Sequence, residues 1–403
     1  MKVAIIGGGA AGFFAALSVK EHHPKAKVQI FEKTSKLLSK VKVSGGGRCN
    51  VTNGTTSISE LWKAYPRGGR QLKKIFHIFN TKHCFEWFES RGVPLMIQED
   101  QCVFPVSQDS QSIIDCFLTQ SNLHKIEIHL KKAVSQIFAD DQFRINLQFK
   151  KGDTLTFDKV IIATGGSPKL SGLKWLEELG HQIETPVPSL FTFNMPSEKI
   201  TELMGIVVEK TLTSIQGTAL KSDGPLLITH WGMSGPAILK LSAFGARYLS
   251  QCNYQFKVQV NWVNERNNDV VRKELESIVE QNAQKNLSNY RPYQLPDRLW
   301  QFLLDKLQLS GEKKWNELGK KGMNQLVVLL TNDTYQVSGK TTFKEEFVTC
   351  GGVSLESINM KTMESKAVKN LYFAGEVMDI DAITGGYNFQ AAWTTAYIAG
   401  MLK

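Results

Sequence analysis

The sequence predicts an α/β fold built around a parallel sheet, and three observations support this prediction. The β-branched run Val3–Ile6 leads directly into a glycine-rich turn and then into the apolar segment Phe13–Val19, which is the order strand, turn, helix. A second short strand, Lys27–Phe31, follows at the distance that one helix requires. Two further apolar runs, Val160–Ala163 and Leu371–Phe373, also lead into glycine-containing turns. We therefore expect several parallel strands whose carboxyl ends carry turns.

Composition fits an ordinary globular protein of two or three domains. The chain has 403 residues, of which 42% are hydrophobic and 21% are charged. Its net charge is +10, and residues 1–91 carry the excess, with 16 Lys and Arg against 5 Asp and Glu. Such an uneven charge indicates either a polyanionic partner or basic residues around a phosphate-bearing cofactor.

Several function classes are disfavoured. The six cysteines form no C-x-x-C pair and the eight histidines form no metal-ligand motif, so we predict no metal site and a reducing cytoplasmic location. Glycines interrupt the apolar stretch near the N-terminus, which argues against a signal peptide. No other segment approaches the roughly 18 consecutive apolar residues of a membrane span. We expect no association with a membrane.

The first turn matches the G-x-G-x-x-G fingerprint of dinucleotide-binding proteins. Gly7 makes the turn, Gly9 lets a pyrophosphate approach the backbone, and Gly12 lets the helix pack closely on the strand. The free N–H groups at the helix start would hold the phosphates. Glu32, at the end of the second strand, would bind a ribose diol, which favours FAD or NAD over NADP.

A second glycine-rich segment, residues 43–53, separates this chain from a simple nicotinamide dehydrogenase. Its successive glycines permit close approach to a ligand, and Arg48 and Asn50 supply hydrogen-bond donors, although a plain loop is the alternative. Three strand ends far apart in the sequence indicate one long, extended cofactor, for which Glu376 would bind a ribityl hydroxyl. Residues 384–390 open the last helix, whose dipole would stabilise negative charge on a reduced flavin.

Taken together, these motifs resemble one known family. The motifs that carry the resemblance are residues 7–12, 44–53, 229–237, 362–366, 373–376 and 385–388. Along the whole chain, from Met1 to Lys403, the sequence resembles the HI0933-like family of bacterial FAD-dependent flavoproteins. The resemblance implies an FAD-binding Rossmann domain of the glutathione-reductase type, interrupted by a β-rich insert and a small helical insert.

The implied domain limits are 1–188 and 350–403 for the FAD-binding domain, 189–264 and 334–349 for the β-rich insert, and 265–333 for the helical insert. Residues 188–263 show the pattern of short strands and turns. Helices are expected over Asp269–Asn282, Pro296–Leu307 and Asn324–Leu330, and Tyr335–Ser338 is expected to return to the β-rich part as a strand.

The resemblance further implies flavin chemistry of one of three kinds: reduction of a uridine in large-subunit ribosomal RNA, oxidation of aminoacetone, or reduction of bile-acid intermediates. The chain lacks a second dinucleotide fingerprint and a pair of redox cysteines, which counts against a disulfide reductase, although NAD(P)H can still dock transiently. We favour an NAD(P)H-dependent reductase that forms dihydrouridine. The alternatives are an oxidase of a small amine that uses oxygen, and an RNA- or ribosome-binding protein with structural FAD.

Candidate contacts with RNA lie in the basic N-terminal third. The predicted RNA-binding residues are Lys63, Arg67, Arg70, Lys73 and Lys74. The aromatic residues Trp62, Tyr65 and Phe76 lie between them and could stack on bases. A solvated helix face with a few buried aromatic side chains is the alternative.

For the proton donor we consider two residues. Cys49 lies between Arg48 and Asn50, where its pKa would be lowered, and His230 lies in a turn of the insert; each also has a purely structural interpretation. Tyr387 and Asn388 are expected to contact the flavin ring. The predicted cofactor-binding residues are Gly7, Gly9, Ala10, Ala11, Gly12, Glu32, Lys33, Ser44, Gly47, Arg48, Cys49, Asn50, Val134, Ala163, Thr164, Gly165, Gly166, Gly375, Glu376, Gly385, Gly386, Tyr387, Asn388 and Gln390.

Overall fold

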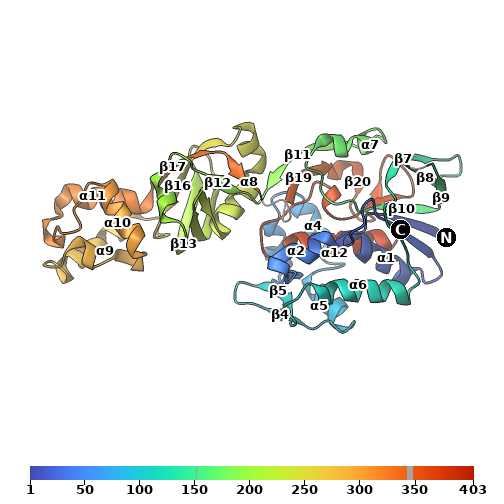
Figure 1. The fold of residues 1–403 in the computed structure, drawn as a ribbon, viewed down its shortest axis with the longest axis horizontal. Helices are drawn as coiled ribbons and strands as arrows, with labels where there is room; N and C mark the ends of the chain where they lie inside the picture. The colour runs from blue at the N-terminus through green and yellow to red at the C-terminus, as the bar shows by residue number, and fades with distance from the viewer. Residues whose placement is uncertain (151, 343–347) are drawn as a thin grey trace. The chain divides into compact units, whose positions relative to one another are not determined.

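The computed structural model describes residues 1–150, 152–342 and 348–403 (Figure 1). Its contacts divide the chain into two compact units: unit 1 comprises Met1–Ser189 and Phe343–Lys403, and unit 2 comprises Leu190–Thr342. The chain therefore leaves unit 1, builds unit 2 and returns. The finer division into three domains, with the helical insert separate from the β-rich insert, stays a prediction.

A seven-stranded sheet forms the centre of unit 1, with the order β20-β21-β22-β10-β1-β2-β6. Five strands run parallel: β1 (Lys2–Ile6), β2 (Lys27–Phe31), β6 (Glu127–His129), β10 (Lys159–Ile162) and β22 (Leu371–Phe373). The short strands β20 (Ile358–Asn359) and β21 (Glu364–Ser365) complete one edge in antiparallel pairing. The central strands are buried on both faces, which is why their sequences are continuously apolar. The predicted parallel sheet is confirmed.

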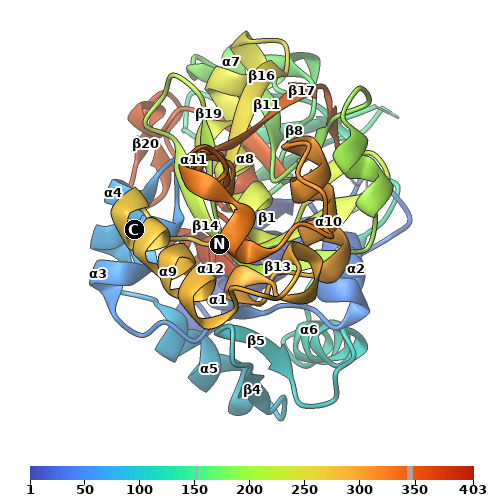
Figure 2. The ribbon, with the colours of Figure 1, turned by 90° about the vertical axis from the view of Figure 1, so that its left-hand side faces the viewer.

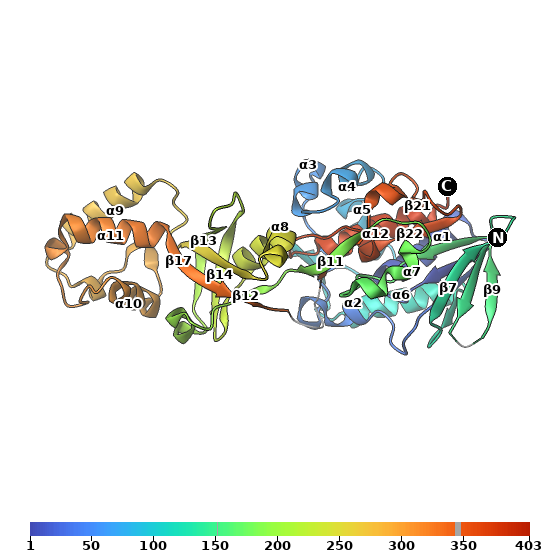
Figure 3. The same cartoon turned by 90° about the horizontal axis from the view of Figure 1, so that it is seen from above.

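Two helices that are far apart in the sequence pack together in unit 1. Helix α1 (Ala10–His22) lies against α12 (Tyr387–Gly400), and Figure 3 shows them next to the sheet. The close approach depends on small residues, because a Cβ atom at Gly400 would lie 2.5 Å from the Cβ of Ser18. Ser18 Oγ also donates to the Tyr397 carbonyl at 2.7 Å. The end of the chain thereby supports the helix that follows the first glycine turn.

The remaining elements of unit 1 surround this centre. A three-stranded antiparallel sheet of β7 (Val134–Ala139), β8 (Ile145–Phe149) and β9 (Thr154–Phe157) packs on β2, where the Phe31 ring meets those of Phe149 and Phe157. A second small sheet contains β3 (Thr52–Asn53), β4 (Leu95–Ile97) and β5 (Cys102–Pro105). The further elements are α2 (Ser39–Val43), α3 (Ile58–Leu61), α4 (Gly69–Ile75), α5 (Thr81–Glu89), α6 (Gln111–Leu123), α7 (Lys174–Glu177), β11 (Ile183–Ser189) and β19 (Val348–Val353).

Unit 2 is built on a second seven-stranded sheet, with the order β17-β16-β13-β14-β15-β12-β18. Its strands are β12 (Thr192–Asn194), β13 (Val207–Ile215), β14 (Lys221–Thr229), β15 (Gly232–Ser234), β16 (Gln255–Asn261), β17 (Asp333–Ser338) and β18 (Lys340–Thr341). The helices α9 (Asn268–Gln281), α10 (Asp297–Lys306) and α11 (Gly319–Thr331) are drawn in gold to orange in Figure 2. The three predicted helices and the returning strand are confirmed, although α11 begins at Gly319 and not at the predicted Asn324.

One hydrophobic core joins the sheet and the helices of unit 2. Val258 and Trp262 from the β16 region are buried in the same cluster as Leu326 and Leu330 of α11. The Trp262 N–H also donates to the Leu330 carbonyl at 2.8 Å. Because these side chains share one core, the helical part is stabilised by burial against the sheet.

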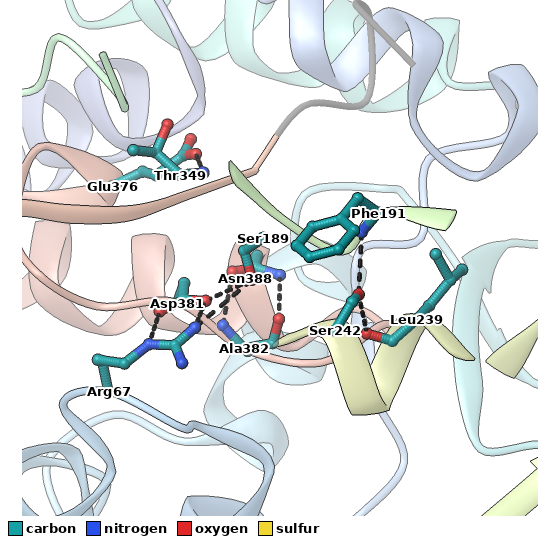
Figure 4. A network of polar contacts seen from close by, with 10 residues as sticks. All are labelled: Arg67, Ser189, Phe191, Leu239, Ser242, Thr349, Glu376, Asp381, Ala382 and Asn388. Atoms are coloured by element: carbon teal, nitrogen blue, oxygen red, sulfur yellow. Dashed lines mark hydrogen bonds and ion pairs between the residues drawn. The ribbon is translucent and has the colours of Figure 1, made fainter. Parts of the chain in front are cut away.

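The expectation of only strands and turns between residues 188 and 263 is wrong. Helix α8 (Pro236–Gln251) lies in this range and buries Ile238, Leu241 and Leu249 along one face. Pro236 stands at its first turn, a position where the missing N–H of proline costs nothing. Near the middle of α8, Ser242 Oγ accepts from the Phe191 N–H at 3.0 Å and donates to the Leu239 carbonyl at 2.8 Å (Figure 4).

Across the described residues, none of the helices combines the length and apolar character that crossing a membrane requires.

Candidate functional site

Predicted glycine turns from three parts of the chain meet at the carboxyl edge of the parallel sheet. The residues that follow the strands are joined by backbone hydrogen bonds, from Ala163 N–H to Ile6 at 2.8 Å and from Ala374 N–H to Ile162 at 2.9 Å. Gly375 lies so close to Ala11 that a Cβ atom there would be 2.7 Å from the alanine Cβ. The turns after β1, β10 and β22 therefore form one continuous rim.

Within the first turn, the three fingerprint glycines differ in their surroundings. A Cβ atom at Gly7, where φ is +116°, would lie 2.3 Å from the Ala163 carbonyl oxygen, and one at Gly12 would lie 1.9 Å from the Gly7 oxygen. At Gly9 the Cβ position has no atom within 4 Å, and no side chain caps the helix there. Gly7 and Gly12 thus close the turn, whereas Gly9 leaves space at a helix N-terminus that suits an anion.

Glu32 is fixed at the end of β2 by two backbone donors. Its carboxylate accepts from the Gly8 N–H at 2.9 Å and from the Thr34 N–H at 2.8 Å. Each oxygen can accept a further hydrogen bond, so the diol of a ribose can still bind. The Lys132 N–H donates to the Glu32 carbonyl at 2.9 Å, which brings the segment leading to Val134 alongside, and Lys33 is exposed next to it.

The second glycine-rich segment has the backbone of an anion-binding nest. Gly45, Gly46 and Gly47 have φ values of +58°, +68° and +87°, a left-handed region that glycine adopts without strain. Arg48 folds back over the segment, where its Nε donates to the Gly45 carbonyl at 3.2 Å. Its guanidinium also covers the Phe104 ring at 4.1 Å. The Cβ positions of Gly46 and Gly47 have no atom within 4 Å, so this nest leaves open space.

Glu376 lies in a polar cluster after β22. It accepts from the Thr349 N–H at 2.9 Å, drawn in Figure 4, and from Lys40 Nζ at 2.6 Å. The Thr349 hydroxyl is fully buried and has no hydrogen-bond partner among the described residues. A Cβ atom at Gly166 would lie 2.7 Å from the Glu376 carboxylate. An unpaired buried hydroxyl beside a carboxylate and a glycine fits the hydroxyl groups of a ribityl chain.

The loop that opens α12 is held from inside by side chains. Asn388 accepts from the Ala382 N–H at 3.0 Å and donates to the Ala382 carbonyl at 3.2 Å (Figure 4). Asp381 is fully buried, and it accepts from Arg67 Nε at 2.5 Å and from Ser189 Oγ at 2.7 Å. Burial raises the pKa of Asp381, and Arg67 and Ser189 oppose this rise. These contacts fix the loop that carries Gly385 and Gly386.

The sequence matches the family described as HI0933-like protein Rossmann domain over residues 1–402. The chain belongs to the HI0933-like family. Its fit to an FAD molecule rests on the open helix N-terminus at Gly9, the open nest at Gly46 and Gly47, and the unpaired Thr349 hydroxyl. As a member of this family, the chain is an FAD-dependent oxidoreductase, and the resemblance seen in the motifs is confirmed.

Two curated relatives match this HI0933-like chain along nearly its whole length. It is 29% identical to the ribosomal RNA dihydrouridine synthase of Escherichia coli, covering 98% of this chain and 95% of the relative. It is 25% identical to the 3-dehydro-bile acid delta(4,6)-reductase of Clostridium scindens, covering 99% and 98%. A solved structure, the 3-ketosteroid delta1-dehydrogenase of Sterolibacterium denitrificans, has a TM-score of 0.51 at 10% identity and covers 99% of this chain and 98% of its own, which shows a shared fold.

Cys49 and Gln390 do not behave as expected in this HI0933-like protein. Cys49 is fully buried, and burial raises its pKa to about 12, so the prediction of a lowered pKa is wrong. Gln390 is also fully buried, accepts from Thr52 Oγ1 and donates to Thr394 Oγ1 at 3.0 Å. Both side chains are buried by the fold, and the sequence around them does not reveal this burial.

The predicted basic residues divide into two groups. Arg67 is only 10% exposed and is paired with Asp381, so its expected role in RNA binding conflicts with its position. Arg70, Lys73 and Lys74 are exposed on α4, and Lys63 is exposed beside Glu60 at 2.8 Å. The rings of Tyr65 and Phe76 are buried, with exposed fractions of 4% and 0%, so they cannot stack on bases.

His230 is exposed in the turn between β14 and β15, in unit 2, and its ring packs edge-on against Trp231 at 4.4 Å. Sequence reasoning missed Lys40 and Thr349 as residues of the site. It gave Tyr65 a role in RNA stacking, whereas the Tyr65 hydroxyl donates to the Tyr387 carbonyl at 2.7 Å. Lys40 belongs to the basic excess of residues 1–91, which could have identified it. Thr349 and Tyr65 carry no motif, because only the fold brings them to the rim.

Proposed function

We propose that this flavoprotein reduces a carbon–carbon double bond conjugated to a carbonyl group, that its substrate is a uridine base of large-subunit ribosomal RNA, and that NAD(P)H is the electron donor. The two curated relatives support the reaction type. A dihydrouridine synthase and a bile-acid delta(4,6)-reductase both saturate such bonds, although their substrates differ in size. FAD supplies the hydride for this chemistry when it is bound.

The observation that carries the RNA substrate is the attachment of the basic helix α4 to the rim of the cofactor site. The Ile383 N–H donates to the Ala64 carbonyl at 2.9 Å, which ties the loop before α12 to the segment before α4. A Cβ atom at Gly68 would lie 2.7 Å from Ile380. Arg67 and Asp381 complete the attachment. Helix α4 therefore begins next to the loop that leads into the site, and its exposed residues Arg70, Lys73 and Lys74 lie within the two turns that follow.

In this arrangement one group of residues binds the cofactor and another binds the RNA. The N-terminus of α1 binds the pyrophosphate, Glu32 the ribose, and Glu376 with Thr349 the ribityl hydroxyls. Exposed lysines and arginines of α4 contact backbone phosphates, which hold RNA without reading its sequence. The target base must leave its stack to reach the site, as in other enzymes that modify bases.

A test in two half-reactions separates the alternatives. Purified protein with bound FAD is kept free of oxygen, NADH or NADPH is added, and the flavin absorbance is followed. Ribosomal RNA from cells that lack the protein is then added, and its nucleosides are analysed by mass spectrometry. We expect bleaching by a nicotinamide, reoxidation by the RNA, and a uridine that has gained two hydrogens.

Each other outcome overturns a stated part of the proposal. Reoxidation by a small enone but not by RNA would overturn the substrate and keep the reaction type. Absence of bleaching together with oxygen uptake on aminoacetone would replace the reductase by an amine oxidase. Flavin that no donor reduces would leave FAD with a structural role.

A further inference from the structure

Reduction of a conjugated double bond requires a proton donor for the carbon next to the carbonyl group, and the two residues first considered do not supply one in unit 1. Cys49 is sealed in the core, and His230 belongs to unit 2. Glu376 is ion-paired with Lys40, and Asp381 is held by Arg67. Within unit 1, the remaining kind of donor is a protonated group that is partly accessible at the rim.

Tyr387 meets these requirements. It is the first residue of α12 and follows Gly386, and its side chain is half-buried. A Cβ atom at Gly385 would lie 3.1 Å from the Tyr387 ring, so the ring lies directly over the glycine turn. Side chains at a helix start point back toward the N-terminus, where the helix dipole favours a negative charge such as a phenolate.

Neighbouring groups hold the ring in place. Tyr65 is buried, its hydroxyl donates to the Tyr387 carbonyl at 2.7 Å, and its ring meets the Tyr387 ring edge-on at 6.1 Å. Asn53 donates to the Gly385 carbonyl at 2.9 Å, which fixes the turn under the ring. The position of the Tyr387 ring is therefore fixed both by the backbone of the turn and by the Tyr65 side chain.

The Tyr387 phenol is also protonated at neutral pH. Burial raises its pKa above 10, the nearby Cys102 thiol adds to the rise, and an interaction with the Thr55 side chain opposes it. The Thr55 hydroxyl donates to Asn53 Oδ1 at 2.7 Å and can turn toward a phenolate. Of the titratable groups near the phenol, burial raises the pKa of Tyr65 well above 10 and that of Cys102 to about 11, so both stay neutral.

We propose that Tyr387 is the catalytic acid, and that its phenol gives the proton to the substrate carbon next to the carbonyl group while Thr55 stabilises the phenolate. This inference rests on the proposed reduction of a conjugated double bond. A hydride arrives at the far carbon of the double bond, and the π electrons form an enolate on the substrate. The O–H bond of Tyr387 breaks as the C–H bond forms, and the phenolate regains a proton from water.

The Tyr387→Phe variant tests this assignment because it keeps the ring and removes the hydroxyl. We expect it to bind FAD with the affinity of the wild-type protein, measured by reconstitution of apoprotein, and to be reduced by NAD(P)H at the same rate. Reoxidation by the unsaturated substrate should slow about 10²- to 10⁴-fold, the usual contribution of a positioned acid. Reoxidation at the wild-type rate would overturn the proposal.

Tyr397→Phe is the matched control, because Tyr397 is a tyrosine in the same helix and burial likewise raises its pKa. It lies near the other end of α12 and should reoxidise at the wild-type rate; an equal loss in both variants would indicate a general effect on the helix and overturn the assignment. If the wild-type flavin is not reoxidised by any conjugated substrate, the proposed function itself fails, a result distinct from the failure of Tyr387 alone.

Thr55→Val gives a second measurement, which also applies if Tyr387→Phe loses FAD. It keeps the phenol but removes the hydroxyl that favours the phenolate, so reoxidation should slow about tenfold, the effect of one hydrogen bond to a charged group. Flavin reduction by the nicotinamide should not change. Equal slowing of both half-reactions would point to a structural role for Thr55 and contradict its part in the proposal.

Discussion

Units 1 and 2 each contain a buried aspartate that is paired with one cation, and the two aspartates have different structural roles. In unit 1, Asp381 is bound by Arg67 and Ser189. In unit 2, Asp333 is bound by Lys306 at 2.5 Å, by Trp262 Nε1 at 3.0 Å and by the Tyr335 hydroxyl. The side chains of the two aspartates are 0% and 1% exposed.

The difference lies in what each aspartate holds together. Asp333 connects α10 with β17 and the end of β16, all of which belong to the core of unit 2. Asp381 lies in a loop without regular structure, and its contacts fix the approach to Gly385 and Gly386. The same electrostatic arrangement therefore stabilises a core in one unit and positions a glycine turn in the other.

The largest expected effect is on unit 2. Asp333→Ala leaves the Lys306 ammonium, the indole N–H of Trp262 and the Tyr335 hydroxyl without their acceptor. The free energy of unfolding should therefore fall by about 3–5 kcal/mol. Denaturant unfolding followed by tryptophan fluorescence measures this change. Lys306→Met is a milder control, because Asp333 then still accepts hydrogen bonds from Trp262 Nε1 and from the Tyr335 hydroxyl. A loss below about 1 kcal/mol for Asp333→Ala would show that the network contributes little.

Arg67→Met tests the corresponding pair in unit 1. It leaves Asp381 buried without a cation, which should cost about 3 kcal/mol at pH 7 and loosen FAD. The unpaired carboxyl then has a pKa above the roughly 3.9 of the unfolded chain, so the folded variant binds a proton more tightly. Its stability relative to wild type should therefore be greatest near pH 4 and fall as pH rises. A pH-independent difference between the two proteins would contradict this account.

A pair of glycine variants separates binding from folding in unit 1. Gly9→Ala adds a methyl group to open space, so the free energy of unfolding should hardly change, whereas FAD should bind at least about tenfold more weakly, or about 1.4 kcal/mol. Gly12→Ala adds a methyl group 1.9 Å from the Gly7 oxygen and should destabilise the unit by about 1–3 kcal/mol as well. Calorimetry of FAD binding and thermal unfolding measure the two effects. An unchanged FAD affinity in Gly9→Ala would contradict the assignment of the pyrophosphate to this turn.

The smallest effect concerns the surfaces of the two units. Replacing Lys73 and Lys74 by Glu should weaken RNA binding about fivefold at 0.15 M salt and lower the salt slope by about 2. FAD content should stay the same. The control replaces Lys320 and Lys321, which are also adjacent and exposed but belong to unit 2. Equal weakening in both double variants would assign RNA binding to general charge rather than to α4.

Local sequence signals predicted the elements that depend on local chemistry. The parallel strands and the first glycine turn follow from apolar runs and from the φ values that only glycine adopts freely. Helix α8 was missed because Gly235 and Pro236 also suit a turn, and proline at the first turn of a helix uses the same residues.

The candidate site could be predicted only in part, because burial depends on contacts between distant segments. Arg48 and Arg67 look alike in sequence, yet Arg48 folds over a nest at the rim whereas Arg67 is paired inside the protein with a residue 314 positions away. Cys49 lies next to Arg48 in the sequence, but burial raises the pKa of its thiol, and a hydrogen bond with Ser44 opposes this rise without cancelling it. Pattern alone identifies which residues can do chemistry, and packing decides which of them reach the rim.

The order of the segments in unit 1 has a consequence for synthesis of the protein. Strand β22 and helix α12 complete the sheet and support α1, but they are translated after all of unit 2. A growing chain on the ribosome therefore exposes a contiguous unit 2 that can fold before the partner strand and helix of unit 1 exist. Cofactor capture must then be a late event, and a shortage of FAD should produce molecules with a finished unit 2 and a protease-sensitive unit 1.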